Sequence, residues 1–272
     1  MTSSGWQYAI ALRNTNWEGT VKMIKRALTC LLMALGLTAL ASNSFADEKK
    51  TADPQTPPAK VKKVKKPKHI DLVMILDQSG SMHSLTSDTI GGYNSMVDKQ
   101  RKAGIPVSVT TVLFNNEEKT LYNRKPIAEV PALTNAEYAP QNMTALLDAT
   151  GNTLNRMKST KGVNAKNNKV IVVLITDGME NASKEYKRDD VKKINSDLQE
   201  KHGWEFIFLG ANIDAAAEAG SIGIKSSNAV KYKNTGTGVK ANYEAVGTMM
   251  EEAAMAVPEE ERTWKSKVEK AD

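Results

Sequence analysis

The chain has 272 residues, 40% of them hydrophobic and 25% charged, so it is long enough to form one or two domains with a hydrophobic core. Its single cysteine excludes an intramolecular disulfide. The net charge of +6 comes from the first 69 residues, because residues 70–272 hold 25 basic and 27 acidic residues. This charge distribution argues against a nucleic-acid partner.

Residues 1–46 are predicted to form a secretory signal region. The basic residues Lys25 and Arg26 precede an uncharged apolar run of about 15 residues, and small residues end at Ala46, where a signal peptidase would cut. This run is shorter than the ~20 residues of a membrane-spanning helix, although an uncleaved anchor is an alternative. We expect Met23 to be the true start and the protein to be periplasmic or secreted from a bacterium.

Residues 47–69 are predicted to form a disordered linker. This stretch contains eight lysines and four prolines, and it has too few apolar side chains to offset the entropy of ordering. Its lysines suit contact with an anionic envelope surface, and a solvated spacer is the alternative.

Five segments have the pattern of β-strands. Ile70–Leu76 and Lys169–Thr176 are short, β-branched and apolar on both faces, which is typical of central parallel strands covered by helices. Val107–Phe114 and Trp204–Leu209 are two further strands. Lys119–Tyr122 follows a tight turn, so we expect an antiparallel edge strand there.

Amphipathic segments separate these strands and predict helices over 86–102, 144–157, 189–201, 212–219 and 239–256. The order predicts an α/β fold: a doubly wound, mostly parallel sheet with one antiparallel edge strand and helices on both faces. Ligands are expected at the carboxyl ends of the strands. The domain is predicted to span residues 70–257, and residues 258–272 a charged, loosely held tail.

Polar side chains follow the two most buried strands. Asp77, Ser79 and Ser81 lie two positions apart after the first strand, with Gly80 expected to permit the tight turn between them. Thr144 opens a predicted helix, and Asp177 follows the strand that ends at Thr176. Neighbouring strands would bring all of these oxygens to one edge of the sheet.

The Asp-x-Ser-x-Ser motif, the threonine at a helix start and the Thr-Asp-Gly motif together resemble the metal-ion-dependent adhesion site (MIDAS) of von Willebrand factor A-type domains. The resemblance covers residues 70–257 and implies a Rossmann-like fold. It also implies a metal site made by five residues: Asp77, Ser79, Ser81, Thr144 and Asp177. Oxygen ligands of this kind suit Mg²⁺ best, and also Mn²⁺ or Ca²⁺. The resemblance further implies a protein partner that offers an Asp or Glu carboxylate to the metal.

We therefore expect an exported, metal-dependent, adhesion-type binding module. The alternative is a regulatory or assembly subunit of a larger envelope complex. An enzyme is not expected, because nucleophilic serine chemistry needs a nearby base and only His69, His83 and His202 are available. The sequence leaves the partner's identity and the oligomeric state open.

Two smaller groups of residues have competing interpretations. Glu180 and Asn181 follow the Thr-Asp-Gly motif, and either line the rim of the metal site or cap the next loop. Met249, Met250 and Met255 lie on the last predicted helix, where packing in the core is favoured over a groove for a partner helix.

Overall fold

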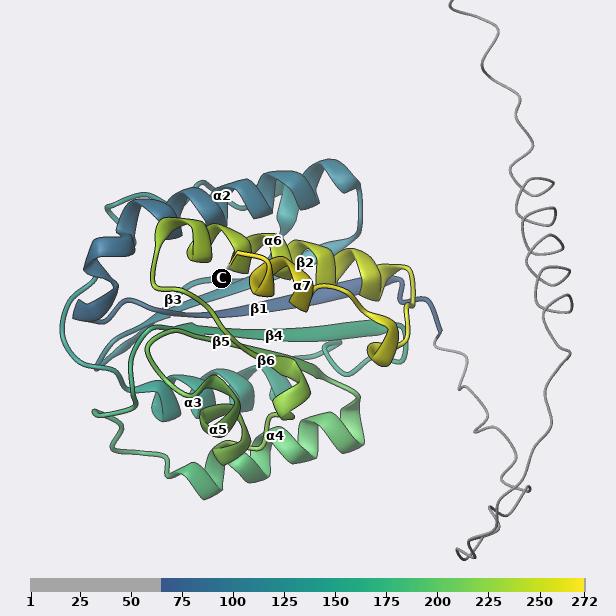
Figure 1. Cartoon of the computed structure of the whole chain (residues 1–272). Helices are drawn as coiled ribbons and strands as arrows, with labels where there is room; N and C mark the ends of the chain where they lie inside the picture. Colours follow the sequence, from purple (N-terminus) through teal and green to yellow (C-terminus); the bar gives the residue numbers. More distant parts are fainter. Residues whose placement is uncertain (1–64, 272) are drawn as a thin grey trace, which may run out of the picture. The chain divides into compact units, whose positions relative to one another are not determined.

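The computed structural model describes residues 65–271, which contain a six-stranded sheet (Figure 1). The strand order is β3-β2-β1-β4-β5-β6, and neighbouring strands are parallel except for β3, which pairs antiparallel with β2 at one edge. The strands are β1 (His69–Asp77), β2 (Val107–Phe114), β3 (Glu118–Pro126), β4 (Asn168–Thr176), β5 (Glu205–Gly210) and β6 (Ala229–Lys231).

Helices cover both faces of the sheet, which confirms the predicted doubly wound α/β fold (Figure 1). On one face lie α2 (Thr86–Ala103), α6 (Gly236–Ala254) and α7 (Lys265–Glu269); on the other lie α3 (Leu146–Ser159), α4 (Arg188–His202) and α5 (Ala215–Ser221). Short 3₁₀ turns complete the connections: η1 (Gly80–Leu85), η2 (Ile127–Glu129), η3 (Ser226–Asn228) and η4 (Glu259–Glu261).

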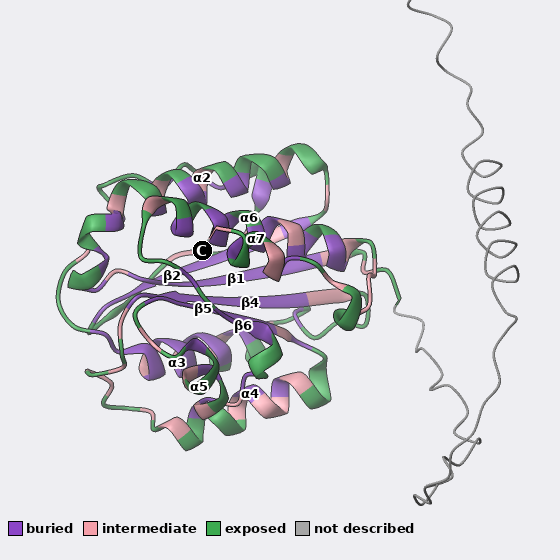
Figure 2. Cartoon of the chain, viewed as in Figure 1, coloured by how far each residue is buried: buried purple, intermediate pink, exposed green. Residues whose placement is uncertain are grey.

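Strand β1 illustrates why both faces of the sheet are buried (Figure 2). Successive side chains of a strand point to opposite faces. Leu72 and Met74 pack in the core under α2 and α6, whereas Val73 and Ile75 pack in the core under α3 and α4. A strand covered on both sides therefore needs the continuous apolar run from which it was predicted.

All five predicted strands and all five predicted helices are present, with ends that shift by a few residues. The sequence did not predict β6. This strand has only three residues, too few for an alternating pattern, and it forms by parallel pairing of Ala229, Val230 and Lys231 with β5. Its existence therefore depends on tertiary packing rather than on a local signal.

The prediction of a loosely held tail after residue 257 was wrong. Trp264 and Val268 are buried in the core beside α6, with exposed fractions of 4% and 0%. The guanidinium of Arg262 forms a two-pronged ion pair with Glu205 at the start of β5, in which Nη2 donates to Oε1 over 3.0 Å. The buried side chains of Trp264 and Val268 and this ion pair hold the segment against the domain, although charged residues dominate its composition.

The boundary of the predicted linker also differs from the structure. His69 is the first residue of β1, and its ring nitrogens hydrogen-bond the side chains of Asn168 and Ser108 on the two neighbouring strands. The predicted signal region and residues 47–64 of the linker lie outside the described residues, so both stay predictions. Within residues 65–271, no helix is long and apolar enough to cross a membrane.

Candidate metal centre

The ends of β1 and β4 place two carboxylates at the same edge of the sheet. Asp77 is the last residue of β1, and Asp177 follows Thr176, the last residue of β4. The two strands are adjacent and parallel, as the sequence suggested, although the two aspartates are 100 residues apart in the chain. This edge lies where the strand order reverses direction, the usual ligand position in doubly wound folds. Both residues are buried, with exposed fractions of 1% and 2%.

The loop after β1 turns its two serine hydroxyls toward Asp177. The backbone N–H of Ser79 donates to Asp77 Oδ1 over 2.6 Å, which folds the loop back over the strand end. The Oγ atoms of Ser79 and Ser81 are 3.1 Å apart, and Ser81 Oγ donates to Asp177 Oδ1 over 2.5 Å. Gly80 is not among the glycines with a positive φ, so its expected conformational role is wrong; its N–H donates to the Asn142 carbonyl over 2.9 Å.

Thr144 joins the same cluster from the loop before α3, two residues ahead of the helix itself. A Cβ atom built on Gly178 would lie 3.4 Å from Thr144 Oγ1 and 3.4 Å from Ser81 Oγ, so these two hydroxyls flank one point on the backbone after Asp177. The structure therefore brings together all five residues predicted from the sequence: Asp77, Ser79, Ser81, Thr144 and Asp177.

Asn181 fixes the position of the Thr144 backbone. Its side-chain Oδ1 accepts the N–H of Thr144 over 2.9 Å. The backbone N–H groups of Asn181 and Ala182 donate to the Thr144 carbonyl over 3.0 and 3.2 Å. The loop after β4 thus holds Thr144 through both its backbone N–H and its backbone carbonyl.

Glu180 caps the loop and the start of α3. Its carboxylate accepts hydrogen bonds from the backbone of Ala182, Ser183 and Leu147, and from the Ser183 hydroxyl. Of the two interpretations that the sequence left open, capping describes Glu180. Asn181 has an exposed location on the rim and also braces Thr144, so it combines both.

Several residues around the two aspartates were not predicted. The hydroxyl of Tyr138, a fully buried residue, donates to the Asp77 carbonyl over 2.6 Å, and Thr176 Oγ1 donates to Asp77 Oδ2 over 2.6 Å. Asn212 and Asn234 each donate over 3.3 Å to Asp177, to its carbonyl and to Oδ2 respectively. The three outside the Thr-Asp-Gly motif lie on separate loops, and no local pattern connects them with the site.

Burial raises the pKa of the Asp77 carboxyl above its ordinary value, and the nearby Asp177 carboxylate raises it further. Burial also raises the pKa of Asp177. Hydrogen bonds from Thr176 and Ser79 to Asp77, and from Ser81 to Asp177, act in the opposite direction. Two carboxylates removed from water at one edge form a site that favours a cation, because a positive charge stabilises both ionised forms.

The chemistry of the donors fits a hard divalent ion. The cluster offers two carboxylates and three hydroxyls, the oxygen ligands that Mg²⁺, Mn²⁺ and Ca²⁺ take. Residues 65–271 contain no group of three or more His, Cys, Asp or Glu side chains placed to hold a metal. A site in this part of the chain therefore depends on its hydroxyls, and the partly open side at Ser81, an exposed residue, leaves room for a further ligand.

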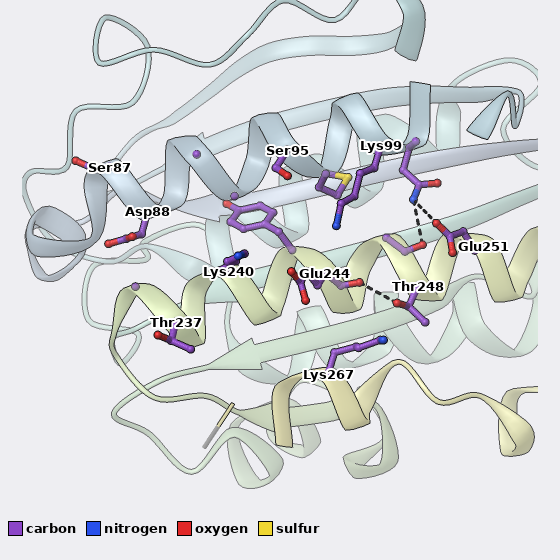
Figure 3. A pocket seen from close by; sticks show the side chains of 17 residues that line it. Ser87, Asp88, Ser95, Lys99, Thr237, Lys240, Glu244, Thr248, Glu251 and Lys267 are labelled. Carbon is purple, nitrogen blue, oxygen red and sulfur yellow. Dashed lines mark hydrogen bonds between the residues drawn. The ribbon is translucent and has the colours of Figure 1, made fainter. Parts of the chain in front are cut away.

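A separate groove of about 1070 Å³ lies between α2 and α6 and contains none of the five site residues (Figure 3). It forms where small residues such as Gly91 and Gly236 line the two helices, while Gly92 packs directly against the ring of Tyr243. Its lining includes side chains of both charges, as Lys240 and Glu244 illustrate (Figure 3).

No family model matches this chain, and no curated protein matches it in sequence. Many solved structures are similar in fold, among them the following three. The D319A mutant of the PilB minor pilin from Streptococcus sanguinis is 12% identical, with a TM-score of 0.50 over 77% of this chain and 69% of that one. The vWF domain of the type V pili tip protein Mfa5 from Porphyromonas gingivalis is 12% identical, with a TM-score of 0.48 over 68% and 96%.

The third is proximal thread matrix protein 1 from the mussel byssus with a zinc-occupied MIDAS motif, which is 16% identical with a TM-score of 0.49 over 69% of this chain. The present chain spans 47% of the length of that mussel protein. At these identities the likeness concerns the fold. The described residues have the doubly wound, mostly parallel α/β fold that the sequence predicted, and the minor pilin shares this fold.

Proposed function

We propose that this chain is a metal-dependent, adhesion-type binding module whose partner is a protein that offers an Asp or Glu carboxylate. The observation that carries the proposal is the convergence of five oxygen-bearing side chains at the edge between β1 and β4. Mg²⁺ is the proposed ion, held by Asp77, Ser79, Ser81, Thr144 and Asp177. Bound there, the ion supplies a Lewis-acidic position for one further anionic oxygen.

The residues of the chain have distinct tasks in this proposal. The carboxylates of Asp77 and Asp177 provide the negative charge, and both are fixed by hydrogen bonds from neighbouring hydroxyls. The two carboxylates just balance the charge of a divalent ion, because the serine and threonine hydroxyls are neutral. A bound ion would therefore stay electrophilic toward one further carboxylate oxygen, that of the partner. Asn181 holds Thr144 in place for this role.

We propose binding rather than catalysis as the activity of this edge. The serine hydroxyls are engaged with each other and with Asp177. His69 is at the opposite, amino end of β1, and His202 is at the end of α4, so neither is placed to act as a base for these hydroxyls. His83, in η1 after the loop, is exposed to solvent.

We further propose that the chain is exported, with residues 1–46 as its signal and the basic residues before β1 as a tether. The support for this location is the predicted signal pattern, together with the occurrence of the same fold in a minor pilin and in a pilus tip protein. In this proposal the metal edge lies at the carboxyl end of β1, the opposite end of that strand from His69.

The test measures metal binding and partner binding with two matched variants. Thr144→Ala removes one proposed ligand, whereas Thr150→Ala removes a buried hydroxyl of α3 that has no hydrogen-bond partner among the described residues. We expect Thr150→Ala to bind Mn²⁺ and Mg²⁺ as the wild type does, and Thr144→Ala to bind at least 10-fold more weakly. Equal metal affinities of the two variants would contradict the proposal.

Affinity capture from the native envelope fraction, in Mg²⁺ and in EDTA, then identifies the partner. A protein retained only with metal and with Thr144 intact fits the adhesion-type module. Retention of a multisubunit envelope complex by the same criterion would favour the alternative, a regulatory or assembly subunit.

A further inference from the structure

Two exposed methionines stand beside the proposed metal edge. Among the large hydrophobic residues of the described chain, three are exposed: Met143 by 56%, Met179 by 68% and Met255 by 64%. A single exposed apolar side chain needs no explanation on a protein surface. Two of these three, however, lie within two positions of a proposed metal-site residue in the sequence, which is a concentration that the rest of the described surface does not repeat.

Met143 and Met179 lie on two loops that hydrogen bonds hold together. Met143 directly precedes Thr144, and Met179 follows Asp177 by two residues, so each is within about 7 Å along the chain of a residue of the site. Gly178 and Thr144 are in contact, because a Cβ on Gly178 would lie 3.4 Å from Thr144 Oγ1. The bonds of Asn181 to Thr144 tie the two loops together, so their separation is set by the fold.

The remaining side chains that ring this edge include several amides. The side chains of Asn212 and Asn234 contact Asp177 directly, and Asn142 lies on the neighbouring loop, where its backbone carbonyl accepts the N–H of Gly80. All three are exposed. Amide groups offer both donors and acceptors, which suits the polar backbone of an extended peptide. The edge thus combines a position for one carboxylate, apolar side chains beside it and peptide-compatible amides around it.

From this arrangement we propose that Met143 and Met179 determine specificity, by selecting a partner segment in which the Asp or Glu is flanked by a large apolar side chain such as Leu, Ile or Phe. This inference rests on the proposed function. Methionine is unbranched and polarizable, so it adapts to apolar side chains of different shape. The apolar contact would supply affinity that a lone carboxylate lacks, while the carboxylate would set the register of the segment on the metal edge.

The test uses the full chain in Mg²⁺ and two fluorescent heptapeptides with a central Glu, one with Leu on both sides and one with Ser on both sides. We expect the wild type to bind the Leu peptide at least 10-fold more tightly, the scale of discrimination by a few buried methylenes. The double variant M143Q/M179Q keeps side-chain length but is polar, and we expect it to reduce the preference below 3-fold. M255Q is the matched control, an equally exposed methionine at the end of α6, and should keep the full preference.

The outcomes separate the two proposals. Loss of binding of both peptides in EDTA and in Thr144→Ala, with no preference for Leu in the wild type, would overturn the inference on specificity while the metal-dependent function stands. A Leu preference that survives in M143Q/M179Q would likewise overturn it. Binding of both peptides that is indifferent to EDTA and to Thr144→Ala, or binding of neither peptide by the wild type, would overturn the proposed function itself.

Discussion

Replacing Glu180 by Gln tests whether the loop after β4 positions the proposed metal site. The carboxylate of Glu180 accepts the N–H of Ala182 and of Ser183 at Oε1, over 2.9 and 2.8 Å. At Oε2 it accepts the N–H of Leu147 and the Ser183 hydroxyl, over 2.9 and 2.7 Å. Four donors converge on one side chain, and Leu147 is in the first turn of α3, where a negative charge also interacts favourably with the helix dipole.

The expected change in the free energy of unfolding follows from this geometry. A glutamine offers one acceptor oxygen, and its cheapest orientation keeps the two bonds to Ala182 and Ser183 and turns the amide NH₂ toward Leu147. The Ser183 hydroxyl can rotate to accept, but the Leu147 N–H loses its partner, at a cost of about 1–3 kcal/mol. Loss of the negative charge at the helix start adds about 0.3–1 kcal/mol. We expect Glu180→Gln to lower the free energy of unfolding by about 2–3 kcal/mol.

The metal site should respond as well, because Asn181 is the next residue and braces Thr144. We expect the affinity for Mn²⁺ to fall about 10-fold, the usual effect of disturbing groups that orient metal ligands. Urea denaturation in EDTA measures the loss of stability, and a Mn²⁺ titration in the absence of urea measures the loss of metal affinity.

Glu185→Gln is the matched control in the same loop. Glu185 is exposed and accepts a hydrogen bond from the Asn152 side chain. We expect this variant to remain within about 0.5 kcal/mol of the wild type and to bind Mn²⁺ normally. If Glu180→Gln were as mild as Glu185→Gln in both measurements, the assignment of Glu180 as the cap that positions Thr144 would be refuted.

Three further predictions concern the rest of the domain. The guanidinium of Arg124 donates two hydrogen bonds, over 2.8 and 3.0 Å, to the buried carboxylate of Asp71, and Arg124→Ala removes both. Urea denaturation should show that the free energy of unfolding falls by about 3 kcal/mol, and a fall below about 1 kcal/mol would contradict a structural role for the pair. Trp264→Ala empties a buried position in the docked C-terminal segment and should cost about 3–5 kcal/mol by the same assay, whereas a loosely held tail would tolerate it. Because the pKa values of Asp77 and Asp177 are raised, their ionised forms are disfavoured in the metal-free fold, so these two groups contribute more stability as the pH falls into the range of their folded pKa values. In the same range protons compete with metal, and Mn²⁺ affinity should be half lost at a pH above 3.8, the ordinary aspartate value; half-loss at or below 3.8 would contradict the role of burial.

Met255 shows that a helical pattern predicts burial only as far as the helix extends. Met249 and Met250 are buried in the core, as the sequence predicted for all three methionines of the last helix, but Met255 is 64% exposed. The helix ends at Ala254, and Met255 is its C-cap, so the period that places side chains on the buried face no longer applies to it. The prediction was wrong at this residue because it assumed a helix through Ala256, two residues longer than the real one.

The sequence by itself determined five of the six strands of the sheet and identified five residues as the candidate metal site. Runs that are apolar on both faces form strands only in the middle of a covered parallel sheet, and their carboxyl ends necessarily share one edge. The shared edge of Asp77 and Asp177 follows from that rule, whereas the full set with Ser79, Ser81 and Thr144 is what the resemblance of the motifs to a metal-ion-dependent adhesion site implies. The motifs can be found in the sequence because each of these residues lies within a few positions of the end of a strand or the start of a helix.

Only the tertiary structure decided which residues hold that edge in place and which surround it. Tyr138 reaches Asp77 across 61 positions of sequence, and Asn181 reaches Thr144 across 37, through hydrogen bonds that exist only when separate loops are packed together. The docking of Trp264 and the exposure of Met143 and Met179 are likewise outcomes of packing. Burial is a property of the whole arrangement, because whether a side chain is covered depends on what other parts of the chain lie against it.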